Sequence, residues 1–184
     1  MHEFIALPAI NAIPKDQWDA LLPANAGPFL RYDFLHALES SGSVSADTGW
    51  TPCHLISLDD TGAPCLALPA YIKDHSYGEY VFDWQWAEAY ASYGMQYYPK
   101  LLIGVPFTPV PGPRWLSTNS VDRESLAQGL SEFCTSKGLS GWHMNFPAEE
   151  LAPNTDASER KGCQFIWRNN CLLYTSPSPR DGRI

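Results

Sequence analysis

The sequence predicts a mixed α/β fold of the α+β kind, with a mainly antiparallel sheet flanked by helices, in a domain that spans residues 1–170. Short strand-like and helix-like apolar patterns follow one another along the chain, and no internal repeat is present. The 184 residues are enough for one hydrophobic core. With 45% apolar and 17% charged residues, the composition is that of a folded globular protein.

The first predicted elements are a short strand and two helices. Residues 3–7 have the pattern of a strand. A helix is expected to open near Pro14 and to stop before Pro23, because proline is tolerated at a helix start and breaks its interior. Residues 30–40 place their apolar side chains on one helical face, which predicts a second, amphipathic helix.

A hairpin and a buried strand are expected next. The extended runs 54–58 and 65–72 flank the turn residues 59–62, whose Asp-Asp-Thr-Gly sequence favours a tight reversal. The later run 101–107 is short, nearly continuously apolar and bounded by prolines, which is typical of a central strand. A Pro/Gly loop at 108–114 follows it directly.

The best-defined helix of the sequence begins near Val121 and ends at Lys137-Gly138. Asn119 or Ser120 is its expected N-cap. Its apolar face is expected to pack against strand 101–107, and its N-terminus to lie near loop 108–114; that face consists of Leu126, Leu130, Phe133 and Cys134.

The last predicted elements are strands at 142–146 and 163–167, followed by a tail at 171–184. The tail lacks apolar periodicity and contains two Ser-Pro steps, which is typical of a linker or disordered segment. Its string Leu-Leu-Tyr-Thr-Ser-Pro-Ser-Pro-Arg-Asp also resembles a translated sequencing adapter, so residues 171–184 are interpreted as non-native or disordered. We expect the tail to make few contacts with the domain.

The charge balance argues against DNA and RNA as direct ligands. Twelve basic and twenty acidic side chains give a net charge of −8, without a run of Lys or Arg. Such a field repels phosphate backbones and anionic lipids. No signal peptide is recognised and no apolar run approaches the roughly 20 residues of a membrane span, so the expected location is the cytoplasm.

The five cysteines predict neither a metal site nor a redox pair. They form no C-x-x-C pair and no cluster with histidine at zinc-ligand spacing. Buried, reduced thiols are the expected state, which again favours the cytosol. His36 and His143 are interpreted as structural histidines.

Four stretches in order resemble one family. They are residues 28–39 (PFLRYDFLHALE), 73–84 (KDHSYGEYVFDW), 97–102 (YYPKLL) and 105–110 (VPFTPV) with the following Gly-Pro-Arg. Together they resemble the FemAB-like family of peptidoglycan biosynthesis/recognition proteins, within the GNAT N-acyltransferase superfamily. The resemblance covers nearly all of residues 3–170.

The resemblance implies transfer of an acyl or aminoacyl group onto an amine, by direct attack without an enzyme-bound intermediate. It implies no tightly bound cofactor; acyl-CoA or aminoacyl-tRNA would be the co-substrate, and a small amine or a cell-wall precursor the acceptor. It also implies a chain about twice as long, built from two GNAT-like halves. This sequence would then hold the first half, which is expected to be inactive alone. The alternative is a non-catalytic module that recognises a peptide or glycan.

An aromatic and acidic segment at 77–98 holds the candidate site. Tyr and Trp rings usually fill a core, but rings beside carboxylates also suit a pocket for a polar amine. The candidate proton acceptors are Asp83, Glu79 and His75, a choice that the spacing leaves open. The candidate substrate-binding residues are Tyr77, Tyr80, Trp84 and Trp86.

The Pro/Gly loop is the candidate co-substrate site, because it precedes a helix N-terminus. Thr108, Gly112 and Arg114 are its candidate contacts. Three prolines remove backbone donors there, and the usual Gly-x-Gly or Gly-x-Ala turn of GNAT proteins is absent. A rigid structural turn is the other interpretation of this loop.

Overall fold

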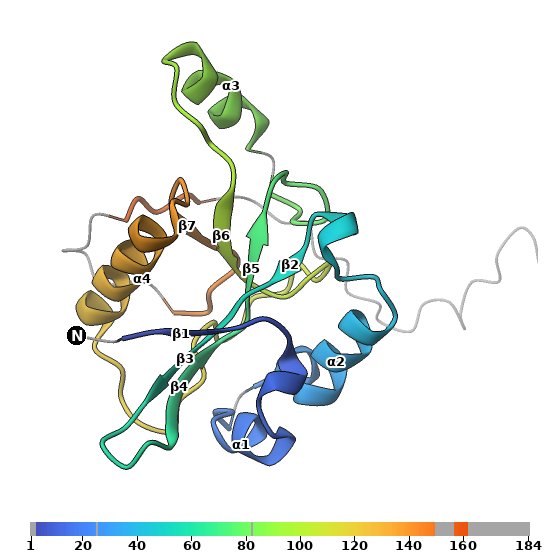
Figure 1. Cartoon of the computed structure of the whole chain (residues 1–184), viewed down its shortest axis with the longest axis vertical. Helices are drawn as coiled ribbons and strands as arrows, with labels where there is room; N and C mark the ends of the chain where they lie inside the picture. The colour runs from blue at the N-terminus through green and yellow to red at the C-terminus, as the bar shows by residue number, and fades with distance from the viewer. Residues whose placement is uncertain (1–2, 25, 82, 150–156, 162–184) are drawn as a thin grey trace, which may run out of the picture.

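The computed structural model describes residues 3–24, 26–81, 83–149 and 157–161, which form two hydrogen-bonded sheets and their flanking helices (Figure 1). The strands are β1 (Ile5–Leu7), β2 (Thr51–Pro52), β3 (His54–Leu58), β4 (Pro64–Leu68), β5 (Ala70–Lys73), β6 (Lys100–Ile103) and β7 (Trp142–Met144). The α-helices are α1 (Lys15–Ala20), α2 (Tyr32–Ser40), α3 (Trp84–Ser92) and α4 (Arg123–Lys137). Short 3₁₀ helices occupy Ile10–Ala12, Pro28–Leu30 and Ala46–Thr48.

The strand arrangement confirms the predicted fold class. One sheet has the order β1-β3-β4 and the other the order β2-β5-β6-β7. All pairs are antiparallel except β6 and β7, which run parallel because α4 connects them. Helices α1 and α2 lie at one side of the structure and α4 at the other, while α3 projects away from both (Figure 1).

The run 65–72, predicted as one strand, is in fact two strands in different sheets. β4 ends at Leu68 and pairs with β3, whereas β5 starts at Ala70 and pairs with β2 and β6. Pro69 lies between them, and a proline has no N–H to continue a ladder. Its carbonyl accepts instead from Gly104 N at 3.1 Å, which joins the break between β4 and β5 to the end of β6.

The predicted packing of α4 on the central strand is confirmed. Leu126, Leu130 and Phe133 share one buried cluster with Leu101 and Ile103 of β6. The loop also lies where it was expected, since Pro113 and Arg114 line the same hollow of about 280 Å³ as Val121 and Arg123 at the start of α4. Helix α4 therefore covers the face of β6 that the odd-numbered residues 101 and 103 occupy.

The predicted N-cap of α4 is wrong. Asp122, and neither Asn119 nor Ser120, holds the N-cap position, because its side chain accepts a hydrogen bond from Glu124 N at 3.2 Å. The helix ends as predicted, at Gly138 with φ of 67°. A carboxylate at the N-cap also interacts favourably with the positive end of the helix dipole.

This cap gives a first prediction. We expect Asp122→Ala to lower the free energy of unfolding by about 1 kcal/mol, because an amide of the first turn loses its acceptor. Urea denaturation of the 184-residue chain measures the change. Asp122→Ser should restore most of the loss, while Ser120→Ala should have no effect; a loss with Ser120→Ala would contradict the assignment.

Other predicted boundaries shift by a few residues. Helix α1 ends at Ala20 instead of near Pro23, and α2 begins at Tyr32 because Arg31 before it is extended. Strand β6 ends at Ile103 and not at residue 107, since Phe107 takes a left-handed φ of 57°. The predicted strand 163–167 and the tail 171–184 lie outside the described residues. Among the described helices, none is long and apolar enough to cross a membrane.

Candidate functional site

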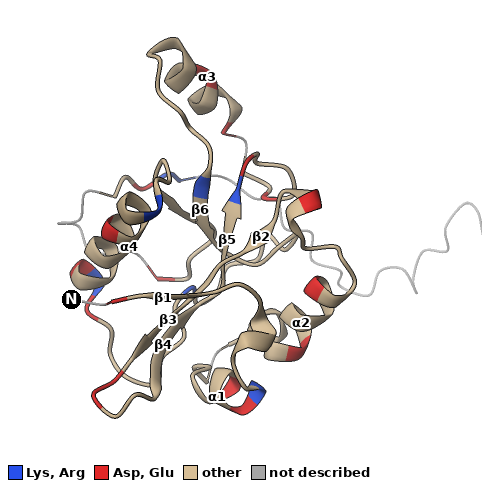
Figure 2. Cartoon of the chain, in the orientation of Figure 1, with Lys and Arg blue, Asp and Glu red and all other residues tan. Residues whose placement is uncertain are grey.

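The candidate site begins as a continuation of one sheet face. In the antiparallel pair of β5 and β6, Tyr71 lies opposite Leu102 and both are buried against Val44 and Trp50. Two residues away on each strand, after Tyr71 in β5 and before Leu102 in β6, the same face carries Lys73 opposite Lys100. Figure 2 shows these two basic positions at neighbouring ends of β5 and β6. The apolar cluster thus gives way to a pair of fully buried lysines.

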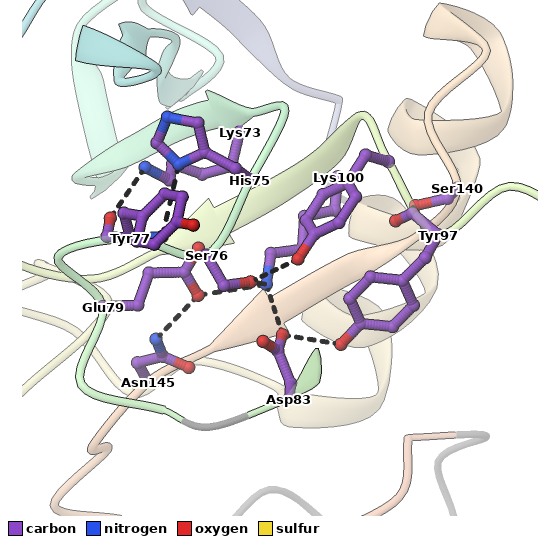
Figure 3. Close-up of polar contacts among 11 residues, drawn as sticks. Lys73, His75, Ser76, Tyr77, Glu79, Asp83, Tyr97, Lys100, Ser140 and Asn145 are labelled. Carbon is purple, nitrogen blue, oxygen red and sulfur yellow. Dashed lines mark hydrogen bonds and ion pairs between the residues drawn. The ribbon is translucent and has the colours of Figure 1, made fainter. Parts of the chain in front are cut away.

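Lys100 is the centre of a buried ionic cluster (Figure 3). Its Nζ donates to Asp83 Oδ2 at 2.7 Å, to Ser76 Oγ at 2.8 Å and to Glu79 Oε2 at 3.0 Å. All four residues are at most 6% exposed. Ser76, Glu79 and Asp83 come from the segment between β5 and α3, so the cluster connects that segment to β6.

Further polar groups orient these carboxylates. Tyr97 donates its hydroxyl proton to Asp83 Oδ2 at 2.8 Å, and the hydroxyls of Ser76 and Tyr98 lie 2.8 Å apart. Asn145, just beyond β7, donates from Nδ2 to Glu79 Oε2 at 3.5 Å. The cluster is therefore built where β5, β6 and β7 meet the segment that leads to α3.

Each carboxylate keeps one oxygen without a hydrogen bond. Within the described part of the chain, Glu79 Oε1 and Asp83 Oδ1 are buried and have no partner. An unsatisfied buried acceptor costs about 1–3 kcal/mol, and more when it is charged. Structures retain such groups where another molecule or a proton can satisfy them.

The pKa values of the two carboxyl groups are shifted in opposite directions. Burial raises the pKa of Glu79, and the nearby Lys100 only partly offsets it. Burial also acts on Asp83, but the hydrogen bonds from Lys100 and Tyr97, together with the charge of Lys100, outweigh it and leave the pKa of Asp83 lowered. Asp83 is therefore the group that keeps its charge, and Glu79 is the one that more readily takes a proton.

Lys73 is buried beside the cluster without a direct carboxylate contact in the described residues. Its Nζ lies 3.8 Å from the ring centroid of Trp50 and donates to the carbonyl of Tyr77 at 3.3 Å. Burial lowers the pKa of Lys73 to about 8, although Glu79 acts against the shift. This ammonium therefore loses its charge at a lower pH than an ordinary lysine does, but it is still mostly charged at neutral pH.

This burial gives a prediction for the pH dependence of stability. Lys73 has a lower pKa in the folded chain than in the unfolded chain, so between pH 8 and 10 the unfolded state binds more protons. We expect the stability of the wild-type chain to rise with pH across this window relative to Lys73→Met. Urea denaturation of both proteins from pH 7 to 10 measures the difference. Parallel curves would show that Lys73 titrates as it does in water.

Residues 74–81, between β5 and α3, form a covering segment over the cluster, and its backbone is left-handed at two positions. Gly78 has a φ of 79° and Tyr80 a φ of 57°; Phe107, in the loop after β6, also has a φ of 57°, which is costly for residues with a Cβ. Gly78 packs so closely on Phe107 that an added Cβ would lie 2.7 Å from the ring atom Cε1. Non-glycine residues in this conformation concentrate at functional sites.

A family model described as FemAB-like, peptidoglycan biosynthesis/recognition, matches residues 9–176. The chain belongs to the FemAB-like family. The search of curated proteins found no match, and neither did the search of solved structures.

The FemAB-like chain brings together two of its three expected proton acceptors. Glu79 and Asp83 share Lys100 as a partner. His75 has other contacts: its Nδ1 accepts from the backbone N–H of Tyr77 at 3.2 Å, and its Nε2 lies 3.7 Å from Asp74 Oδ1. In this structure His75 shapes the start of the covering segment.

The expected substrate-binding rings are on the surface. Tyr77, Tyr80, Trp84 and Trp86 are each more than half exposed, and none lines either of the two surface hollows of about 440 and 280 Å³. The rings of Tyr77 and Trp84 contact each other edge to face, with 6.2 Å between centroids. They stand where the covering segment meets the projecting helix α3.

The expected co-substrate contacts already donate to carbonyl groups of the FemAB-like chain. The amide of Thr108 donates to Val105 O at 3.4 Å, and that of Gly112 to Phe146 O at 3.1 Å. The guanidinium of Arg114 is 2% exposed. Its nitrogens donate to the carbonyls of Asn145, Pro113 and Val110, and burial lowers its pKa to about 10.

Sequence analysis missed Lys73, Lys100 and Asn145 as site residues. A lysine near a strand end is ordinarily solvated, so neither lysine attracts attention alone. A signal was nevertheless present. Lys73 opens the second motif of the family resemblance and Lys100 lies inside the third.

Proposed function

We propose that this FemAB-like protein transfers an acyl or aminoacyl group onto an amine of a cell-wall precursor, with Glu79 as proton acceptor. The observation that carries the proposal is the buried Glu79 carboxylate, which has one oxygen held by Lys100 and the other without a partner among the described residues. Its raised pKa brings it closer to the range in which a carboxylate serves as a base near neutral pH. The peptidoglycan-related family makes a cell-wall precursor the natural acceptor.

The chemical step needs one proton transfer before attack. The acceptor ammonium loses a proton to Glu79, and its nitrogen then forms a C–N bond with the carbonyl carbon of a thioester or ester. The C–S or C–O bond of the donor breaks, and the leaving thiol or hydroxyl takes up a proton as the second N–H proton departs. Asp83 stays ionised throughout and, together with Tyr97, keeps Lys100 in place.

The donor side of the proposal rests on topology. β6 and β7 are a parallel pair within an otherwise antiparallel sheet, and the loop from β6 to α4 is where the GNAT resemblance expects acyl-CoA or aminoacyl-tRNA. The proposal includes the GNAT relationship and a second, similar half beyond this chain. Thr108, Gly112 and Arg114 would contact the donor only after exchanging their present carbonyl partners.

Because the hydrogen-bond donors of this loop already have carbonyl partners, a second candidate function is also supported. A module that only recognises a peptide or glycan needs no donor site, and its exposed Tyr and Trp rings would serve as stacking surfaces. The loop would then be the rigid turn that its internal hydrogen bonds describe.

A mass-spectrometric assay separates the two functions. The longer protein that the proposal implies, with both halves, is incubated with a peptidoglycan stem peptide that carries a free amine. An acyl-CoA or an aminoacyl-tRNA is added as the acyl donor. Transfer adds the mass of the acyl group to the peptide, and an N-acetylated peptide should remain unchanged. Binding of the peptide without any mass increase would support recognition and overturn transfer; the 184-residue chain alone is expected to give no product.

A further inference from the structure

We propose that Glu79 and Asp83 form a binding site for a primary ammonium group, held between Glu79 Oε1 and Asp83 Oδ1. The inference deepens the proposed function and rests on it for one point, that the ammonium belongs to the acceptor. The binding site itself follows from the contacts of the cluster, which are independent of any transfer reaction.

The charges in direct contact do not balance. Two buried carboxylates share a single ammonium, that of Lys100, through one oxygen each. The second lysine, Lys73, acts on Glu79 through space, but it bonds neither carboxylate in the described residues, because its Nζ contacts the Tyr77 carbonyl and the Trp50 ring. The directly bonded group therefore lacks one positive charge, and buried charges without partners are costly.

The free positions suit a cation that donates hydrogen bonds. Glu79 Oε1 and Asp83 Oδ1 are acceptors, so a primary ammonium can give each of them an N–H while its third N–H meets another group. A quaternary ammonium has the charge but no donor. The exposed rings of Tyr77 and Trp84, each adjacent in sequence to a cluster residue, provide faces that attract a cation on its way in.

Entry requires the covering segment to move, because both free oxygens are buried. Two lysines hold that segment down, Lys73 through the Tyr77 carbonyl and Lys100 through Ser76 Oγ. A small backbone rotation at the left-handed residues Gly78 and Tyr80 would relieve strain and move the covering segment away from the two free oxygens. The ligand ammonium would then bind Glu79 Oε1 and Asp83 Oδ1, while Lys100 keeps its contacts with the other oxygen of each carboxylate.

The empty site has a second way to reduce its negative charge, which is to bind a proton on Glu79. The raised pKa of Glu79, caused by burial, agrees with that state. An incoming ammonium favours the ionised carboxylate, so its binding should release the proton. Ammonium binding and proton release are thus expected together.

Calorimetry of the 184-residue chain tests the site directly. n-Butylammonium is titrated at millimolar concentration near pH 6 in two amine-free buffers of different ionisation enthalpy, such as phosphate and cacodylate. We expect saturable binding whose apparent enthalpy differs between the buffers. Tetramethylammonium and KCl at the same ionic strength should give no saturable heat. Absence of binding overturns the site, and equal binding of potassium overturns its selectivity for ammonium.

Variants locate the effect. Glu79→Gln and Asp83→Asn should each weaken binding at least tenfold, and Glu79→Gln should also abolish the buffer dependence. Glu88→Gln, an exposed carboxylate of α3, is the matched control and should bind as the wild type does.

Circular dichroism checks that each variant is folded, and the two-buffer result on the wild-type chain needs no variant. Ammonium binding without peptide acylation would leave this inference standing and refute the proposed function, whereas acylation without ammonium binding would do the reverse.

Discussion

Replacing Lys100 with methionine is expected to lower the free energy of unfolding by about 3–5 kcal/mol, the range for breaking a buried ion pair by removing one partner. Methionine has a similar length and no charge, so the loss comes mainly from two buried carboxylates left without their cation. The difference in unfolding free energy between the wild type and Lys100→Met should become smaller as the pH falls, because protonation neutralises Glu79 and Asp83. Urea denaturation between pH 4 and 8 measures both effects.

Two matched proteins make the Lys100 prediction specific. The triple variant Lys100→Met, Glu79→Gln, Asp83→Asn removes all three charges and should recover much of the lost stability, as expected when a buried ionic group is replaced as a set. Lys137→Met, at the exposed end of α4, should change stability by less than about 0.5 kcal/mol. If Lys100→Met lowered the free energy of unfolding as little as Lys137→Met, the carboxyl groups of Glu79 and Asp83 would not be ionised in the folded chain.

Under the proposed function, Glu79→Gln is expected to lower the acyl-transfer rate of the proposed two-half protein about 100-fold or more, the usual contribution of a general base. Glutamine keeps the acceptor oxygen near Lys100 but cannot take a proton at neutral pH. The rate is measured with the stem-peptide assay, and the thermal midpoint is measured on the same preparation.

The comparison of rate and midpoint decides the role of Glu79. Glu88→Gln should change neither quantity, because Glu88 is exposed on α3. A lowered midpoint with an unchanged rate for Glu79→Gln would show that the carboxylate only braces Lys100. The catalytic assignment would then be abandoned.

Much of the fold could be predicted because its elements have local causes. The apolar face of α4, with Leu126 and Leu130, and the stop at Gly138 depend on residues a few positions apart, and both are found as expected. Pro69 was the misleading case. It lies inside an apolar run, and only the pairing partners of residues on either side reveal that two sheets separate there.

Helix α3 could not be predicted from its aromatic residues. Its rings were expected to line a pocket, yet none of its residues is buried. Asp83 stands at its N-cap, but its side chain makes no capping bond; Oδ2 accepts from Lys100 and Tyr97, and Oδ1 has no partner among the described residues. A long-range contact has thus replaced the local signal by which a helix start is recognised.

The candidate site was predictable only in part for a similar reason. Acidic residues among aromatic ones indicated Glu79 and Asp83, but their common partner Lys100 follows them by more than a dozen residues and lies on another strand. The opposition of Lys73 and Lys100 is set by the register of β5 and β6. No spacing within one motif contains that information.

The parallel pairing of β6 with β7 also orders the folding of this domain. The β3–β4 hairpin joins Leu55 to Leu68 through a short turn, whereas Leu101 meets Trp142 only after α4 has crossed over. Contacts between residues far apart in sequence form slowly, because the chain must be ordered before they compensate. While β7 is undocked, Asn145 and the inner face of the Lys100 cluster would still be hydrated. We therefore expect the two carboxylates to lose their water in the last stage of folding, so that a newly made chain would acquire its proposed ammonium site only when α4 and β7 are in place.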